Sequence, residues 1–161
     1  MRTEHAIRRR LGADARQNAL ALAAWLRAGG MRFERCHEGY WADKFYWLIK
    51  YKDEYVCFIA INGAAYETEP EGWIIWSEDS GSTCFEDFPL DERTREIAWS
   101  HVDVCGNCGF CAGGTRKTIF GKEFNNVCRT PMIFANPDAE TLECVKSIVE
   151  IRKDDIVCKH R

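Results

Sequence analysis

Four cysteines in the C-terminal third of the chain constrain its fold more than any other feature. They are Cys105, Cys108, Cys111 and Cys128, and they form a C-x2-C-x2-C-x16-C array with glycines between the first three. Thiolates grouped this closely are typical ligands of a zinc ion or an iron–sulfur cluster. The array therefore predicts a small cysteine-rich lobe that is held together by a metal.

The spacing favours zinc. The C-x2-C pair of Cys105 and Cys108 supplies two sulfurs to one ion, and Cys128, at the end of a predicted hairpin, supplies a distant one. Cys111 is the expected fourth ligand, and His101, one helical turn before Cys105, is the alternative. Four thiolates would close the coordination shell, so we expect a structural zinc ion rather than a catalytic one.

Two other interpretations use the same cysteines. The triplet Cys105, Cys108 and Cys111 resembles the start of a bacterial ferredoxin motif, which implies an iron–sulfur cluster, although Cys128 is not followed directly by proline. The Cys105–Cys108 pair also resembles a thioredoxin-type C-x-x-C, which implies thiol redox chemistry. A helix is predicted before this pair, whereas the thioredoxin arrangement places one after it.

The overall composition is that of a folded protein. Hydrophobic residues make up 46% of the 161 residues and charged residues 29%, enough apolar area for a core. The net charge of −3 makes nonspecific nucleic-acid binding unexpected. Arg8-Arg9-Arg10, with Arg2 and Arg16 nearby, is a local exception, which we interpret as a solvated helix face. The alternative is a patch for phosphate or an acidic partner.

The other cysteines indicate a reducing compartment. Nine cysteines is an odd number, and the apolar stretch 19–26 follows residues too polar for a secretory signal. The sequence contains no run of about 18 apolar residues, so no membrane-spanning helix is predicted. We therefore expect a cytoplasmic protein. Five cysteines are expected to be ordinary thiols: Cys36, Cys57, Cys84, Cys144 and Cys158.

The first half of the chain predicts one helix and then several strands. Leucines and alanines recur at helical spacing over residues 13–28, and Gly29-Gly30 ends this pattern. Alternating aromatic and branched residues then predict strands. Their ranges are 31–36, 45–51, 55–61, 73–76 and 83–88, with a turn at 62–63 and an acidic loop at 67–72.

The second half predicts a hairpin between two helices. Asp91 is the expected N-cap of a helix that leads to Cys105. Segments 115–120 and 123–127 predict the hairpin, and 132–135 predicts one more strand. Asn136-Pro137-Asp138 is typical of a helix start, and Arg152 and Lys153 suit the C-terminus of that last helix.

These elements predict an α+β fold. An antiparallel sheet of about four to five strands with packed helices should be followed by the cysteine-rich metal-binding lobe and a C-terminal helix. The boundary falls near residue 90, which gives an α/β lobe at 1–90 and a cysteine-rich lobe at 91–161. We expect the two lobes to pack as one compact unit.

Large aromatic side chains provide the second functional candidate. Trp41, Trp47, Trp73 and Trp76 all lie in or beside the predicted sheet, where they either fill the core or line a ligand pocket. If there is a pocket, it should lie on the second face of the sheet, to which Tyr46 and Leu48 also contribute.

The sequence contains no catalytic signature. Segment 113–118 is glycine-rich and basic like a phosphate-binding loop, but it does not match that motif and fits a hairpin edge better. We therefore expect a noncatalytic zinc-binding module that binds a small ligand or a protein partner, with a possible regulatory role. The alternative is an iron–sulfur or thiol redox protein.

Overall fold

A computed structural model describes residues 2–61 and 72–161. The strands of this part of the chain are β1 (Arg32–Arg35), β2 (Phe45–Tyr51), β3 (Glu54–Ile61), β4 (Trp73–Ser77), β5 (Val102–Val104), β6 (Thr115–Ile119) and β7 (Lys122–Ala135). They form one seven-stranded antiparallel sheet in the order β1-β2-β3-β4-β7-β5, with β6 paired to β7 off this path. The expected turn at 62–63 and most of the acidic loop lie outside the described residues.

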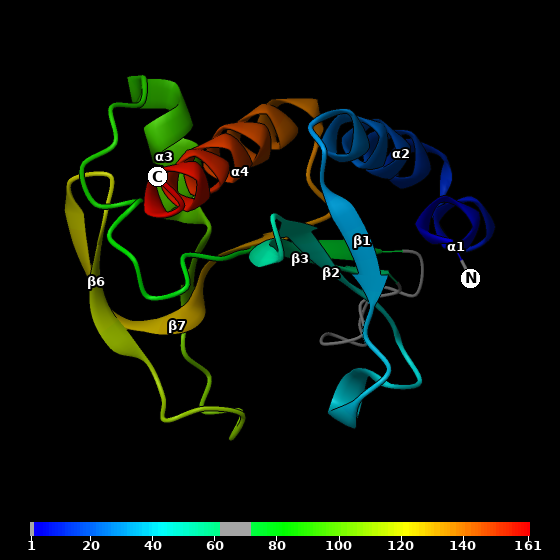
Figure 1. Cartoon of the computed structure of the whole chain (residues 1–161), viewed down its shortest axis with the longest axis horizontal. Helices are drawn as coiled ribbons and strands as arrows, with labels where there is room; N and C mark the ends of the chain where they lie inside the picture. Colours follow the sequence, from blue (N-terminus) through cyan, green and yellow to red (C-terminus); the bar gives the residue numbers. More distant parts are fainter. Residues whose placement is uncertain (1, 62–71) are drawn as a thin grey trace.

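The helices cover one side of this sheet (Figure 1). They are α1 (Thr3–Arg10), α2 (Ala13–Ala28), α3 (Glu92–Ser100) and α4 (Ala139–Lys159). A 3-10 turn, η1 (Gly39–Trp41), lies between β1 and β2. No helix in the described ranges combines the length and the apolar character that a membrane crossing requires.

The alternation of β2 sets which residues enter the main core. Trp47 and Ile49 are fully buried between sheet and helices, and Phe45 and Tyr51 pack beside them, as the sequence predicts. Trp73 belongs to the same core. Because neighbouring residues in a strand point to opposite faces, Tyr46 and Leu48 lie on the other side of the sheet.

The cysteine-rich half contributes β5, β6 and β7 to the same sheet, which is larger than predicted. Strand β7 joins the expected segments 123–127 and 132–135 into one strand, whose end pairs with β4. Pro131 lies inside β7, where its missing N–H argues against a continuous strand. The structure accommodates it because β5 pairs with β7 only at Val127 and Met132, with an irregularity between them.

Two local expectations are wrong. Residues 83–88 form successive turns rather than a strand, because the Ser82 hydroxyl and the carbonyl of Thr83 accept the backbone hydrogen bonds that a strand would need. Arg152 does not end the last helix, since α4 continues to Lys159. The expected N-cap Asp91 is present and accepts a hydrogen bond from the Thr94 amide. The last helix begins within the expected segment, but its N-cap is Asp138, which accepts from the Thr141 amide, whereas Asn136 accepts from the Trp73 amide.

Candidate functional site

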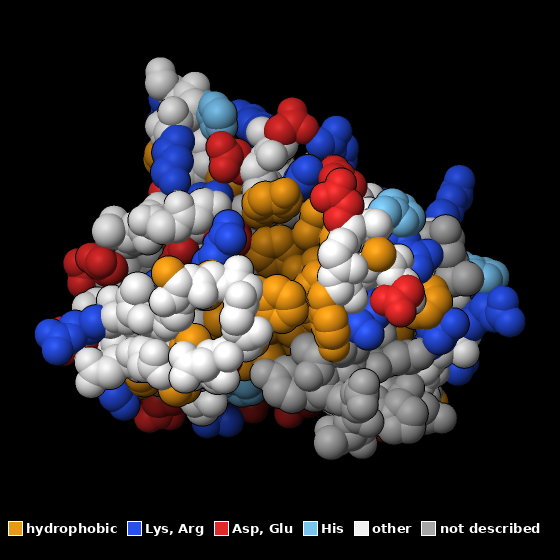
Figure 2. Space-filling model, turned by 90° about the horizontal axis from the view of Figure 1, so that it is seen from below, with side chains coloured by type: hydrophobic (Ala, Val, Ile, Leu, Met, Phe, Trp, Pro, Cys, Tyr) orange, Lys and Arg blue, Asp and Glu red, His pale blue; other side chains and the backbone are white. Residues whose placement is uncertain are grey.

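The sheet face without helices carries a row of side chains that crosses five strands. The register aligns Leu48 with Phe58 and Phe58 with Trp76, and it aligns Trp76 with Ile133 on β7. Glu34 on β1 is opposite Leu48 and ends the row with a carboxylate. In Figure 2, hydrophobic side chains form the floor of a hollow on this face. This apolar floor, made of Phe58, Ala60, Ile74 and Trp76 with Trp41, Tyr46, Leu48, Tyr55 and Ile133 packed against them, is the strongest candidate ligand site.

Aromatic rings contact one another along this floor. The Trp41 ring from η1 stacks on Tyr46, with ring centroids 4.2 Å apart and planes 17° apart. Tyr46 is nearly parallel to Phe58 at 6.0 Å, and Trp76 meets Trp41 edge-on at 5.9 Å. Such pairs hold each ring in a defined orientation. Two of the four predicted pocket tryptophans, Trp41 and Trp76, therefore lie on this face, whereas Trp47 and Trp73 fill the main core.

Two chain segments meet beside the floor. One contains η1 and carries Tyr40, and the other is the cysteine loop, which we define as residues 105–114. The Phe110 ring of the cysteine loop lies 5.7 Å from the Tyr40 ring. Phe110 is 69% exposed and Tyr40 44% exposed, unusual values for large aromatic residues. Their ring contact connects the two segments.

A buried carboxylate lies at one end of the floor. Glu78 follows Trp76 by two residues, and its side chain is 1% exposed. Its Oε1 accepts a hydrogen bond from the Ser80 amide at 2.6 Å. Burial raises the pKa of the Glu78 carboxyl, although the Ser80 amide opposes that shift. Burial also raises the pKa of the Tyr46 hydroxyl, with a smaller contribution from the Glu78 charge. Both groups therefore resist ionisation.

The cysteine loop crosses β7 near Asn126. Val104 and Thr115, just outside the two ends of the loop, both pair with Val127, and the Cys105 amide donates to the Asn126 carbonyl at 2.7 Å. At the other end, a Cβ on Gly114 would lie 2.4 Å from the Asn126 Oδ1 and 2.7 Å from its backbone. Only glycine fits there, so this close approach explains one of the glycines that the sequence places around the cysteines.

The loop backbone contributes a hydrogen bond to one thiol. The Asn107 amide donates to the Cys105 Sγ at 3.4 Å, and Asn107 itself has a left-handed φ of 55°. Gly109 and Gly113 also have left-handed φ values, of 85° and 105°. The left-handed residues turn the loop backbone tightly around Cys105 and Cys111.

Cys128 lies on β7 among polar groups. The Thr130 hydroxyl donates to its Sγ at 3.7 Å. Asp103 on β5 also hydrogen-bonds Cys128, and this bond lowers the pKa of the Asp103 carboxyl while burial raises it more strongly. The sequence carries no signal for Asp103, because its proximity to Cys128 follows from the β5–β7 pairing.

The four predicted ligands do not form a metal cluster in this structure. Among the described residues, no three side chains of histidine, cysteine, aspartate or glutamate come close enough together to hold a metal ion. Cys108 and Cys111 are exposed on the loop, whereas Cys105, directly after β5, and Cys128, on β7, are half-buried. All nine cysteines carry free thiols. Burial raises the pKa of three of these thiols: Cys57, Cys84 (to about 11) and Cys144 (to about 12). These three are therefore poor nucleophiles at neutral pH.

His101, the alternative ligand, takes part in other contacts. Its ring stacks on Phe134 at 4.7 Å, and Nδ1 lies 2.8 Å from the Ile97 carbonyl of α3. The basic segment 113–118, which was compared with a phosphate-binding loop, also makes contacts within the fold. Residues 115–119 form β6, and Lys117 pairs with the buried Asp79 at 2.6 Å. This segment is the hairpin edge that the sequence favours.

The chain matches no protein-family model, no curated protein and no solved structure. Its function is therefore inferred from the geometry of the apolar floor and the cysteine loop.

Proposed function

We propose that this protein is a noncatalytic binding module that holds a flat, uncharged, mostly apolar small molecule on the apolar floor. The observation that carries the proposal is the row from Leu48 to Ile133 on the sheet face opposite the four α-helices. Contact with this row would remove apolar ligand surface from water at about 25 cal/mol per Å². The stacked rings of Trp41 and Tyr46 favour a planar ligand.

The surroundings of the floor favour a small molecule over a protein partner. Phe110 and Tyr40 meet beside the floor and stand out from the surface. A flat protein surface would meet these rings before it reached Phe58 or Trp76, which are each only 8% exposed. A molecule of one or two fused rings has no such restriction, because it can enter the hollow without moving either segment.

We also propose that one zinc ion binds Cys105, Cys108, Cys111 and Cys128 and fixes the cysteine loop as a wall of this site. The support comes from the half-buried positions of Cys105, directly after β5, and Cys128, on the adjoining β7, and from the Asn107 amide at the Cys105 Sγ. Glycine on both sides of Cys108 and after Cys111 gives the loop the freedom to bring the two exposed thiols to the strand pair. The strands pair through β7 in any case, so the metal would order the loop rather than fold the sheet.

A neutral fluorescent probe tests the ligand site. N-phenyl-1-naphthylamine has two aromatic units and no charge, and its emission rises in apolar surroundings. We expect saturable binding to the native protein and roughly tenfold weaker binding to Leu48→Lys, which puts a charge on the floor. The lysine stem preserves packing, and Glu34, which pairs with Lys50 at 2.9 Å, lies directly opposite.

The matched control is Phe88→Lys. Phe88 is 41% exposed and lies beside Trp25 and α4, away from the apolar floor. Its replacement should leave probe affinity unchanged. Equal probe binding by the native protein and Leu48→Lys, with both folded by near-ultraviolet circular dichroism, would contradict the proposal.

Metal content is tested on protein purified anaerobically without added metal. Elemental analysis by mass spectrometry should find one zinc per chain and no visible absorbance, and Cys128→Ala should lose the metal. Iron with a brown chromophore would instead favour the iron–sulfur alternative. No metal, with four thiols that form reversible disulfides, would favour the redox alternative.

A further inference from the structure

The helical hairpin of α1 and α2 carries a charge opposite to that of the rest of the chain. Residues 1–28 contain six arginines and two carboxylates, a net charge of +4. Because the whole chain has a net charge of −3, residues 29–161 carry −7. A separation of this size directs anions toward one end of the molecule.

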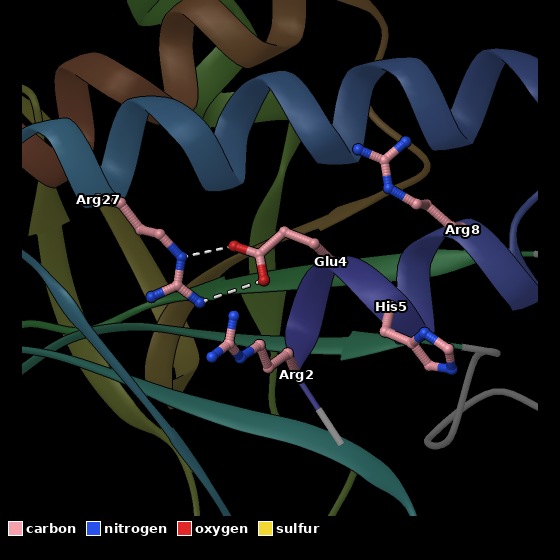
Figure 3. Close-up of a pocket in the computed structure, with 5 residues that line it drawn as sticks. All are labelled: Arg2, Glu4, His5, Arg8 and Arg27. Carbon is pink, nitrogen blue, oxygen red and sulfur yellow. Dashed lines mark hydrogen bonds and ion pairs between the residues drawn. The ribbon is translucent and has the colours of Figure 1, made fainter.

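A depression of about 710 Å³ lies within this basic region and is lined by Arg2, Glu4, His5, Arg8 and Arg27. Figure 3 shows the guanidinium groups of Arg2 and Arg27 near Glu4, with His5 and Arg8 farther along α1. Three arginines and one glutamate give the lining a net charge of +2 with His5 neutral. The depression is therefore a concave cationic surface rather than a scatter of exposed side chains.

The Glu4 carboxylate shows that this surface binds an anionic group. Arg27 donates two hydrogen bonds to the Glu4 carboxylate, from Nε to Oε1 at 2.5 Å and from Nη2 to Oε2 at 3.3 Å. The hydrogen bond from Arg27 lowers the pKa of the Glu4 carboxyl, and the charge of Arg2 adds to the effect. The site thus already favours negative charge on a carboxylate at its centre.

Two lining arginines have no such partner. Among the described residues, neither Arg2 nor Arg8 forms an ion pair with a carboxylate, whereas Arg16 of the same hairpin donates two hydrogen bonds to the Leu11 carbonyl. Guanidinium groups present forked N–H donors that match phosphate oxygens, and every basic side chain of the hairpin other than His5 is an arginine.

We propose that this depression binds a compact polyphosphate group, of the kind carried by pyrophosphate and by nucleoside diphosphates. Arg2 and Arg8 would hold the phosphate oxygens, and Arg27 would bridge the ligand and Glu4. A group with several charges suits a lining of net charge +2, while a single carboxylate is already supplied by the protein itself. This site is separate from the apolar floor and does not depend on the proposed function.

The experiment is calorimetric titration of the full chain with pyrophosphate at constant physiological ionic strength. Arg8→Gln should weaken binding roughly tenfold, the loss expected for charge-assisted hydrogen bonds, and Arg2→Gln should act in the same direction. Arg9→Gln is the matched control, because it removes an equal charge from the same helix but does not line the depression. Glu4→Gln should strengthen binding, because it removes the competing carboxylate.

Two results would overturn the proposal. One is a loss of affinity in Arg9→Gln equal to that in Arg8→Gln, since it would show attraction to net charge rather than a site. The other is tight, salt-sensitive binding of a short single-stranded oligonucleotide together with no binding of millimolar pyrophosphate, which would identify a nucleic-acid surface instead. Sulfate at equal ionic strength should bind more weakly than pyrophosphate, because it offers fewer charges to the same donors.

Discussion

Replacement of Arg152 by methionine tests how the fold supports the end of the sheet next to the apolar floor. Arg152 is fully buried in the middle of α4. Its Nε donates to the Tyr55 carbonyl at 3.0 Å, Nη1 donates to Asp155 at 2.6 Å and Nη2 donates to the Ser80 hydroxyl at 2.8 Å. One side chain therefore joins α4 to β3 and to the turn that carries Glu78.

The structure sets the size of the effect. Removal of one partner from a buried ion pair costs about 3–5 kcal/mol, because the remaining charge stays desolvated. Here the lower end applies, since Asp155 keeps Lys159 at 3.2 Å and Glu54 is 41% exposed and can be rehydrated. Methionine fills most of the same volume, so little cavity cost is added. We expect a loss of about 3 kcal/mol, which corresponds to roughly 6–12 °C in Tm for a domain of this size.

Urea denaturation followed by circular dichroism measures this loss. The control is Arg93→Met, which removes an arginine that is 65% exposed and pairs with Glu140 at 2.7 Å, and which should leave the midpoint nearly unchanged. Burial by itself raises the pKa of the Asp155 carboxyl, but hydrogen bonds from Lys159, Ser82 and Arg152 hold that pKa below its ordinary value. A lowered pKa stabilises the fold at neutral pH and loses that effect as the pH falls below about 4, so the difference in stability between the native protein and Arg152→Met should become smaller there. A loss below about 1 kcal/mol at neutral pH would refute the reasoning.

The remaining predictions concern the floor and the cysteine loop. Glu78→Gln should raise Tm at pH 7, because burial raises the pKa of this carboxyl and its charged form destabilises the fold. The gain in Tm should vanish in acid, where Glu78 is protonated. A gain in Tm that does not depend on pH would contradict this prediction. Gly114→Ala should lower stability by about 1–3 kcal/mol, because its Cβ meets the Asn126 backbone, whereas Gly106→Ala enters open space and should be neutral by thermal denaturation. Phe110→Ala should speed release of N-phenyl-1-naphthylamine in stopped-flow fluorescence, because it removes the contact with Tyr40, and Phe88→Ala should not. Exposed Cys108 and Cys158 should react quickly with a thiol reagent and buried Cys144 slowly, and added zinc should protect Cys108 but not Cys158.

Short-range sequence patterns determined α2 and the starts of α3 and α4. The periodicity of residues 13–28 and the glycines after them predicted α2, Asp91 predicted where α3 begins, and the Asn136-Pro137-Asp138 segment predicted the start of α4 to within two residues. The alternation of β2 also separated its core face from its second face. Each of these signals acts within a few residues, so it is readable without knowledge of the partners.

Only the tertiary structure decided which distant residues meet. Pro131 argued against a continuous β7, yet the irregular pairing with β5 removes the need for its N–H. The apolar row depends on the register of β2, β3, β4 and β7, and strand register follows from pairing rather than from any single strand. Arg152 looked like a helix end because the sequence does not show the carbonyls and carboxylates that surround it. The cysteine spacing suggested a common metal, but whether the four thiols converge depends on how the cysteine loop folds over β7, which spacing alone does not specify.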